Sequence, residues 1–313
     1  MINNLITSKI KALSAIISVV LFWGFSFISI KITVAVFQPM SLGLLRFGIA
    51  IVFLYIIKQK LEPSEKLRLK DIPLLLVAGF VGVTLYFFFE NNGVYLVSAS
   101  EASIAISSIP VLALITDVVF EKIKKKNGKL SETQNSPRVQ QWLGCFISIL
   151  GVILVAGVSF VISGSIRGYI YMTGAAVSWV LYSFLTRALF TRCSRIYIVF
   201  WQSVAGFIMF IPFSIPEFSR WGTINAEVII HLFFLAIFCS ALGYWFYVYA
   251  LEKLGVPICA IFINLIPVVT VLASFFMLGD RLTSLQWLGA GLVIAGVYMT
   301  MITSKKKTGM TEQ

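Results

Sequence analysis

The feature of this sequence that most constrains its fold is a series of ten long apolar stretches, which together cover most of the chain. Each has roughly the 20 residues that a helix needs to cross the hydrocarbon core of a bilayer. The stretches are approximately 12–37, 39–57, 72–94, 100–120, 142–162, 168–188, 196–215, 227–250, 257–278 and 284–302. A transmembrane barrel would instead show ten-residue segments of alternating polarity. The sequence therefore predicts an all-α integral membrane protein with ten transmembrane helices.

Composition supports this interpretation. Hydrophobic residues make up 59% of the chain and charged residues only 12%, whereas a soluble globular protein has about 25% charged residues. So little charge cannot cover a surface that faces water, which excludes a soluble enzyme, a disordered protein and a secreted disulfide scaffold. The four cysteines form no Cys-x-x-Cys pair, and we expect them to be small unbonded side chains.

The charge that remains is strongly basic, with a net charge of +12. Of the 25 Lys and Arg residues, Lys31 and Arg46 lie inside predicted spans and three others, Arg167, Arg220 and Arg281, lie on one side of the membrane. The remaining 20 lie on the side that holds both termini. Basic residues collect in cytoplasmic loops. We therefore expect a multi-pass protein of the cell (cytoplasmic or inner) membrane with both termini in the cytoplasm, and the basic excess predicts no nucleic-acid partner.

An internal repeat divides the chain. The sequence Gln-Trp-Leu-Gly occurs at 141–144 and again at 286–289, and Ile-Pro-Val occurs at 109–111 and again at 266–268. We predict two five-helix repeats, the first at 1–163 with a basic loop at 121–140 and the second at 164–313 with a basic tail. Because each repeat has an odd number of spans, the second copy is inverted relative to the first. Inverted repeats with a site between them are typical of secondary transporters.

Several motifs recur in the order typical of one family. They are Trp-Gly-Phe-Ser-Phe at 23–27, Leu-Arg-Phe at 45–47, Pro-Val at 110–111 and 267–268, Gly-Asp-Arg at 279–281 and the paired Gln-Trp-Leu-Gly segments. In these motifs the chain resembles the EamA-type transporters of the drug/metabolite transporter superfamily, over nearly its whole length. The resemblance implies a ten-helix transporter of small polar metabolites, often an exporter of amino acids, that works by alternating access.

Charged groups inside spans are expensive and are therefore candidates for function. Arg46 and Glu90 both fall in the outer half of the first repeat, and we predict that they form a pair. Lys31 is expected near the same water-filled vestibule. Glu90 is also the candidate group for coupling transport to protons. The alternative is structural: a buried pair that orders the bundle, and a lysine that snorkels to the interface.

Uncharged polar and aromatic groups extend the predicted site, because small ligands bind in apolar cavities with a few placed polar groups. Trp23 and Trp179 are repeat-related, as are Arg46 and Gln202. The complete predicted substrate-binding set is Trp23, Arg46, Glu90, Asn91, Trp179, Tyr182, Gln202, Tyr244 and Asn264. The alternative for each aromatic residue is packing or contact with lipid.

Two prolines, Pro110 and Pro267, lie at matched positions of the fourth and ninth spans. A proline inside a helix removes a backbone hydrogen bond and kinks the helix. We predict that both act as hinges, with static curvature around the cavity as the alternative.

The sequence contains no Walker-type phosphate loop, no His-Glu-x-x-His and no His/Cys cluster. We therefore expect no enzymatic activity, no metal and no cofactor. The favoured function is secondary active transport, in the direction of efflux, with a passive channel or facilitator, or a membrane scaffold without coupled transport, as the alternative. The expected partners are a small-molecule substrate and membrane lipid, and the expected state is a monomer or homodimer.

Overall fold

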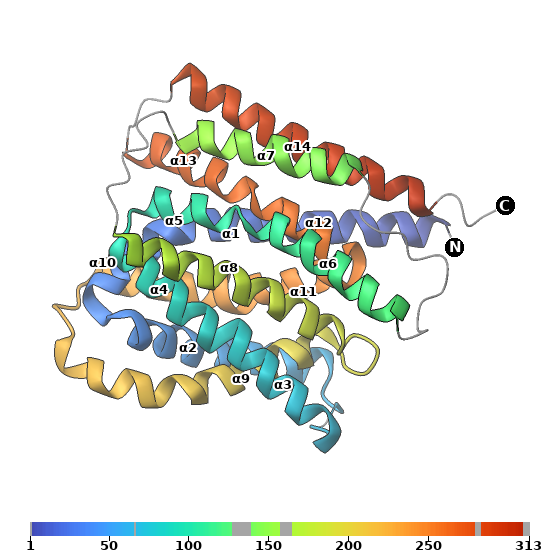
Figure 1. Ribbon diagram of the computed structural model, residues 1–313. Helices are drawn as coiled ribbons and strands as arrows, with labels where there is room; N and C mark the ends of the chain where they lie inside the picture. The colour runs from blue at the N-terminus through green and yellow to red at the C-terminus, as the bar shows by residue number, and fades with distance from the viewer. Residues whose placement is uncertain (1, 66, 127–138, 157–164, 279–282, 309–313) are drawn as a thin grey trace.

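The computed structural model describes residues 2–65, 67–126, 139–156, 165–278 and 283–308. All regular secondary structure within these ranges is helical (Figure 1). In the part of the chain that the structure describes, eight helices are long and apolar enough to cross a membrane, and Val139–Val155 forms a shorter apolar helix. The remaining predicted span is the 22-residue helix at Ile166–Arg187. The prediction of an all-helical membrane protein is confirmed.

Six predicted spans are single helices. These are α1 (Ile2–Phe37), α2 (Pro39–Leu61), α7 (Val139–Ala156), α8 (Ile166–Arg187), α9 (Arg195–Ser214) and α14 (Ser284–Thr308). Short 3₁₀ turns, η1 (Leu69–Asp71) and η3 (Ile215–Arg220), lie in the connections that follow α2 and α9.

The other four spans are composite. The third consists of α3 (Ile72–Gly79), the π-helical segment η2 (Phe80–Leu85) and α4 (Tyr86–Leu96). The eighth consists of α10 (Ala226–Phe234), the π-helical segment η4 (Leu235–Leu242) and α11 (Gly243–Leu254). The fourth is divided into α5 (Ala99–Ile106) and α6 (Ile109–Lys126), and the ninth into α12 (Val256–Ile263) and α13 (Leu265–Leu278). Interruptions thus occur in the same spans of the two halves.

The division of the fourth and ninth spans corrects one expectation. Pro110 and Pro267 do not kink a continuous helix, because each lies in the first turn of a new helix, α6 or α13. An N–H in the first turn has no partner within its helix, so a proline there loses no hydrogen bond. The break itself is a tight turn in both halves, and each turn is closed by a backbone hydrogen bond. Ser107 N donates to Ile104 O at 2.9 Å, and Asn264 N donates to Ile261 O at 3.2 Å.

Helices α7 and α14 cross closely in an antiparallel arrangement at one edge of the bundle (Figure 1). A Cβ atom added to Gly151 would lie 2.6 Å from the carbonyl oxygen of Gly289, and one added to Gly144 would lie 2.7 Å from that of Gly296. Small residues allow this approach of backbones between membrane helices. Gly144 and Gly289 occupy the same position in the repeated Gln-Trp-Leu-Gly segment, so each last helix contacts its counterpart in the other half.

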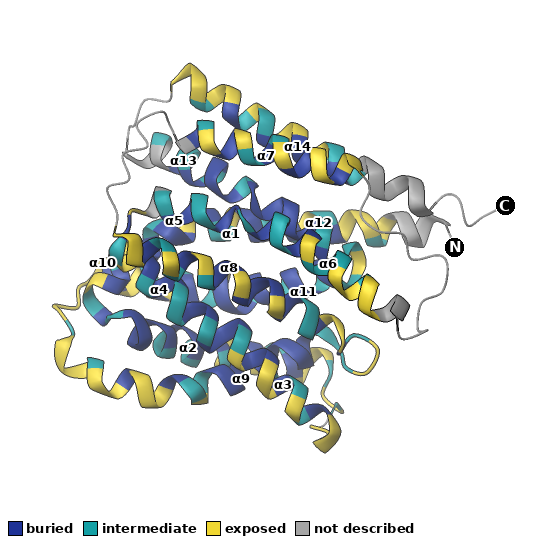
Figure 2. Ribbon diagram, in the orientation of Figure 1, coloured by how far each residue is buried: buried dark blue, intermediate teal, exposed yellow. Residues whose placement is uncertain are grey.

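Buried residues fill the middle of the bundle, and exposed residues lie along its outer helix faces (Figure 2). The exposed set includes large apolar side chains such as Phe146 and Trp287, as expected for a surface in lipid. The described beginning of α1 and the end of α14 lie at the same end of the bundle (Figure 1), as an even number of spans requires. The loop at 127–138, the stretch 157–162 and the Gly-Asp-Arg segment at 279–281 lie outside the described residues.

Candidate functional site

A small cavity lies where helices of the two halves meet. Its lining residues are Trp23, Ser26, Phe27, Arg46, Tyr86, Phe87, Glu90, Ile106, Ile109, Trp179, Tyr244, Ile263 and Ile266. The cavity offers only ≈ 20 Å³ to the centres of water-sized molecules, which is room for about one water. Any metabolite larger than that requires the surrounding helices to move apart.

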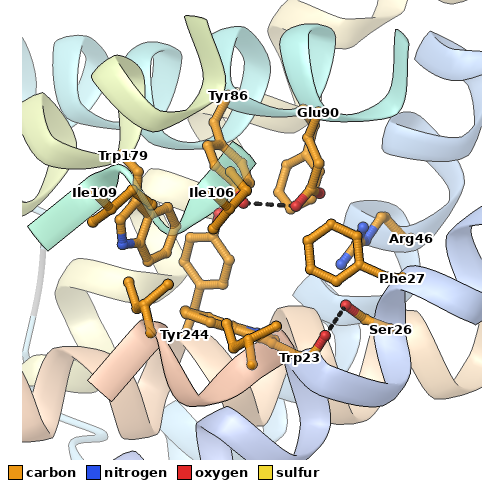
Figure 3. Close-up of a pocket in the computed structure, with 13 residues that line it drawn as sticks. Trp23, Ser26, Phe27, Arg46, Tyr86, Glu90, Ile106, Ile109, Trp179 and Tyr244 are labelled. Carbon is orange, nitrogen blue, oxygen red and sulfur yellow. Dashed lines mark hydrogen bonds between the residues drawn. The ribbon is translucent and has the colours of Figure 1, made fainter. Parts of the chain in front are cut away.

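The residues of the cavity are segregated (Figure 3). Arg46 and Glu90 lie toward one end, and Trp179 and Tyr244 lie toward the other. The cavity therefore combines a charged end with an aromatic end, which is the arrangement that suits a ligand with a polar head and an apolar body.

Arg46 comes from α2 and is only 2% exposed. Its Nε donates a hydrogen bond to Ser240 Oγ at 2.9 Å, and its guanidinium carbon lies 4.2 Å from the centroid of the Phe87 ring. Its Nη1 has no hydrogen-bond partner among the described residues. A buried cation with an unused donor is unfavourable on its own, so this nitrogen is suited to an anionic group of a ligand.

Glu90 comes from α4 and is also buried. Its Oε1 accepts a hydrogen bond from Tyr86 Oη at 2.6 Å. The ion pairs within 4.0 Å between described residues do not include Arg46 with Glu90. The expected direct pair is therefore wrong: the two charges line one cavity without contact, and each can interact with a ligand.

The aromatic end of the cavity is formed by rings from three helices. The ring centroids of Trp23 and Trp179 are 5.0 Å apart at an interplanar angle of 89°, and those of Trp179 and Tyr244 are 5.5 Å apart. Both indole N–H groups already donate hydrogen bonds, Trp23 Nε1 to Cys239 O and Trp179 Nε1 to Tyr247 Oη, each at 3.1 Å. These tryptophans therefore contribute ring surface to the cavity and use their polar edges within the protein.

The structure brings five of the nine predicted binding residues to this cavity: Trp23, Arg46, Glu90, Trp179 and Tyr244. A sixth, Tyr182, packs behind the wall, with its ring centroid 5.2 Å from Trp179 and 5.7 Å from Tyr244.

The three predicted amides lie elsewhere and connect helices. Asn91 Nδ2 donates to Pro39 O at 2.7 Å, and Gln202 Nε2 donates to Thr186 Oγ1 at 3.1 Å. Asn264 Nδ2 donates to Ser148 Oγ at 2.9 Å. None of the three lines the cavity.

Lys31 also has a role other than the expected one. Its Nζ donates hydrogen bonds to the carbonyl oxygens of Val94 at 2.8 Å, Tyr95 at 3.3 Å and Val97 at 2.7 Å. These carbonyls lie at the C-terminal end of α4, where a positive charge is favourable. Lys31 therefore caps a helix and does not face the cavity.

Several lining residues were not predicted from the sequence, above all Tyr86 and Phe87. Tyr86 precedes Glu90 by four residues, which is the spacing of neighbours on one helix face, so its contact with the carboxylate was predictable. The aliphatic residues Ile106, Ile109, Ile263 and Ile266 carried no such signal. Among the described residues, no group of three or more His, Cys, Asp or Glu side chains could hold a metal ion.

A second, open crevice of ≈ 510 Å³ lies at the end of the bundle where α1 begins. It is lined by residues of α1, α9 and α11 and of the segment at the end of α2. Its wall includes Ser194, the residue that precedes α9, and the aromatic side chains Trp245, Phe246 and Tyr249.

Comparison with known proteins adds independent information. The model of the EamA-like transporter family matches residues 10–128 and 166–302, one match for each half of the chain. An uncharacterized transporter of Archaeoglobus fulgidus is 29% identical over 282 residues, covering 90% of this chain and 95% of that protein. A protein of Streptantibioticus cattleyicolor described as a probable terminal-alkyne amino-acid exporter is 25% identical over 289 residues, covering 92% of this chain and 93% of its own.

A crystal structure has the same fold, with a TM-score of 0.74 and 16% sequence identity. The match covers 94% of this chain and 98% of the other. The ten-span arrangement is thus one that a known protein adopts.

Proposed function

Because the chain belongs to the EamA-like transporter family, we propose that it is a secondary active transporter that exports small polar metabolites such as amino acids. Substrate binds in the small cavity between the two halves and is released by alternating access. Both termini and the basic loops face the cytoplasm. The two domains are the five-helix repeats at 1–163 and 164–313, in inverted orientation.

The observation that carries the proposal is the charged end of the cavity. Arg46 offers an unused guanidinium nitrogen, and Glu90 lies in the same cavity without forming an ion pair with it. A zwitterionic substrate satisfies both: its carboxylate binds Arg46 and its ammonium binds Glu90. The rings of Trp23, Trp179 and Tyr244 then receive the apolar part. The name of the Streptantibioticus relative supports amino acids as the class to test first.

Two further features of the mechanism follow. The cavity has room for about one water, so binding and release both require movement of helices. The breaks before Pro110 and Pro267 are placed symmetrically and serve as the hinges of this movement. Among the described residues, Glu90 is the only carboxylate that lines the cavity, so competition between a proton and the substrate ammonium at Glu90 couples export to proton entry.

The test is counterflow in proteoliposomes that contain the purified protein, with labelled amino acids chosen by a thermal-shift screen. A carrier exchanges labelled for unlabelled substrate, whereas a passive channel does not. Arg46→Lys should reduce transport at least tenfold, because an ammonium cannot reproduce the two-donor geometry of a guanidinium. Arg220→Lys, a change at an exposed arginine, is the matched control and should transport normally. Absence of exchange by the unmodified protein for every stabilising ligand would contradict the proposal.

The coupling role of Glu90 has a separate test. Glu90→Gln should weaken substrate binding, because the ammonium loses its charged partner, and the exchange that remains should lose its stimulation by an imposed pH gradient. Transport by Glu90→Gln that is still driven by the gradient would exclude Glu90 as the coupling group.

A further inference from the structure

The second helices of the two halves, α2 and α9, form an antiparallel pair along their length. A Cβ atom at Gly43 would lie 2.6 Å from the Phe210 ring, and one at Gly48 would lie 3.1 Å from the Phe207 ring. The residue numbers of these contacts increase along one helix while they decrease along the other. The N-terminus of each helix therefore lies beside the segment that follows the other.

At the end of the bundle away from the termini, Glu217 holds the beginning of α2. Its Oε2 accepts hydrogen bonds from Met40 N at 2.9 Å and Ser41 N at 2.7 Å, in the first turn of α2. The residue before α2, Gln38, makes no side-chain capping hydrogen bond. The carboxylate that satisfies this helix terminus thus comes from η3, which follows α9 in the other half.

At the opposite end, Glu65 holds the beginning of α9. Its Oε1 accepts a hydrogen bond from Ser194 N at 3.1 Å, and its Oε2 accepts one from Ser194 Oγ. Nearby, Arg68 N donates to Tyr197 Oη at 3.1 Å. Glu65 belongs to the segment that follows α2, so this contact mirrors the one made by Glu217.

Each half therefore supplies a glutamate that binds the N-terminal end of the second helix of the other half. We propose that Glu65 and Glu217 are reciprocal latches, one at each membrane face, which are released in turn as the transporter opens to that face. Both latches are engaged in this structure, and the cavity between the halves has room for about one water. The inference rests on the proposed function, since it names the groups that control access to the same cavity.

The latch at Glu65 adjoins an existing opening. Ser194, which Glu65 binds, also lines the ≈ 510 Å³ crevice between α1, α9 and α11. Release of this latch removes the hydrogen bonds of Glu65 from Ser194, at the start of α9, where that helix borders the crevice. Opening at this end widens the crevice, which becomes the vestibule of the transporter on the side of the termini.

Side-specific labelling tests the latches without knowledge of the substrate. Ser26→Cys places a thiol in the cavity wall, in a background that carries Cys193→Ser; the other native cysteines are buried. A membrane-impermeant thiol reagent is then applied from each side of oriented vesicles. Glu65→Gln should raise labelling at least threefold from the side of the termini only, and Glu217→Gln should raise it from the opposite side only. Equal effects on both sides, or no change, would overturn the proposal.

Cross-linking separates a releasable latch from a permanent clamp. Glu65→Cys with Ser194→Cys, and Glu217→Cys with Ser41→Cys, are joined by a short bifunctional thiol reagent that a reductant removes. Each cross-link should reduce exchange at least tenfold, with recovery on reduction, and the four single-cysteine variants should be unaffected by the reagent. Full transport by both cross-linked proteins would show that these contacts never open. If the unmodified protein transports no tested substrate, the proposed function fails while the labelling result still decides the latches.

Discussion

Tyr244 donates a hydrogen bond from its Oη to the carbonyl oxygen of Gly82 at 2.7 Å, which joins the eighth span to the π-helical segment η2 of the third. A second such bond runs from the first half to the second: Trp23 Nε1 of the first span donates to Cys239 O in the π-helical segment η4 of the eighth span. A π-helical turn disturbs the regular hydrogen bonding of a helix and is frequent at functional sites. Here each π-helical segment receives a donor from a cavity-lining aromatic residue of the opposite half.

The first prediction concerns this contact. Tyr244→Phe keeps the ring but leaves the Gly82 carbonyl without its donor in a buried position, which should lower the free energy of unfolding by about 1–3 kcal/mol. Tyr55→Phe is the control, because Tyr55 is 48% exposed on the outer surface. Thermal unfolding of both variants in detergent checks the difference. Equal unfolding temperatures for Tyr244→Phe and Tyr55→Phe would show that the hydrogen bond from Tyr244 to Gly82 does not stabilise the protein.

The second prediction concerns the crossing of α7 and α14. Gly151→Ala should destabilise the protein, because its Cβ would lie 2.6 Å from both Gly289 O and Val293 N, and backbone atoms cannot move aside easily. Gly291→Ala is matched in chemistry but has no heavy atom within 4 Å of the added Cβ. It should be neutral or stabilising by up to about 1 kcal/mol, since alanine is the better helix former. Thermal unfolding of the two variants measures both effects, and a stabilised Gly151→Ala would refute the close crossing.

The third prediction separates helix capping from substrate binding. Lys31→Met removes three hydrogen bonds from the end of α4 and should lower stability by about 1–3 kcal/mol. The apparent affinity for substrate in counterflow should stay within about twofold, because Lys31 does not line the cavity. Arg46→Met should instead cause a large loss of apparent affinity for substrate. A loss of affinity in Lys31→Met without a loss of stability would show that Lys31 binds substrate and does not stabilise the end of α4.

The fourth prediction concerns Cys193, which lies between α8 and α9. Burial, and after it the carboxylate of Asp71, whose Oδ2 lies 3.6 Å from Sγ, together raise the pKa of this thiol to about 11. The thiolate is the reactive form. Labelling by a maleimide should therefore be slow at neutral pH and should accelerate as the pH rises toward 11.

Asp71→Asn provides the check on that mechanism. It removes the negative charge but not the burial, so the pKa should fall only in part and labelling at neutral pH should become several-fold faster. A rate that does not change in Asp71→Asn would show that the carboxylate has no influence on the thiol.

Much of the fold was predictable because a bilayer imposes simple requirements. The predicted third span at 72–94 corresponds to Ile72–Leu96, and the predicted ninth at 257–278 corresponds to Val256–Leu278. Length and apolarity alone locate such segments. The breaks within them were not predictable, since Pro110 suggested a kink whereas the helix ends before it.

The site was predictable only in part. Arg46 and Glu90 were identified because a charge in a span is costly, and both line the cavity. Their expected pairing failed, because the depth of a residue along a helix does not determine how the helix is rotated. The same limit explains Lys31, whose long side chain reaches the end of α4 and not the cavity.

The sequence by itself determined that this chain is a helical membrane protein with ten spans and an internal repeat, because hydrophobicity, glycine and proline spacing act locally along the chain. Only the tertiary structure decided which polar groups meet. The partners of Arg46, Glu65 and Glu217 lie 194, 129 and 177 residues away. Such contacts depend on the packing and rotation of helices from both halves, and no local pattern in the sequence specifies them.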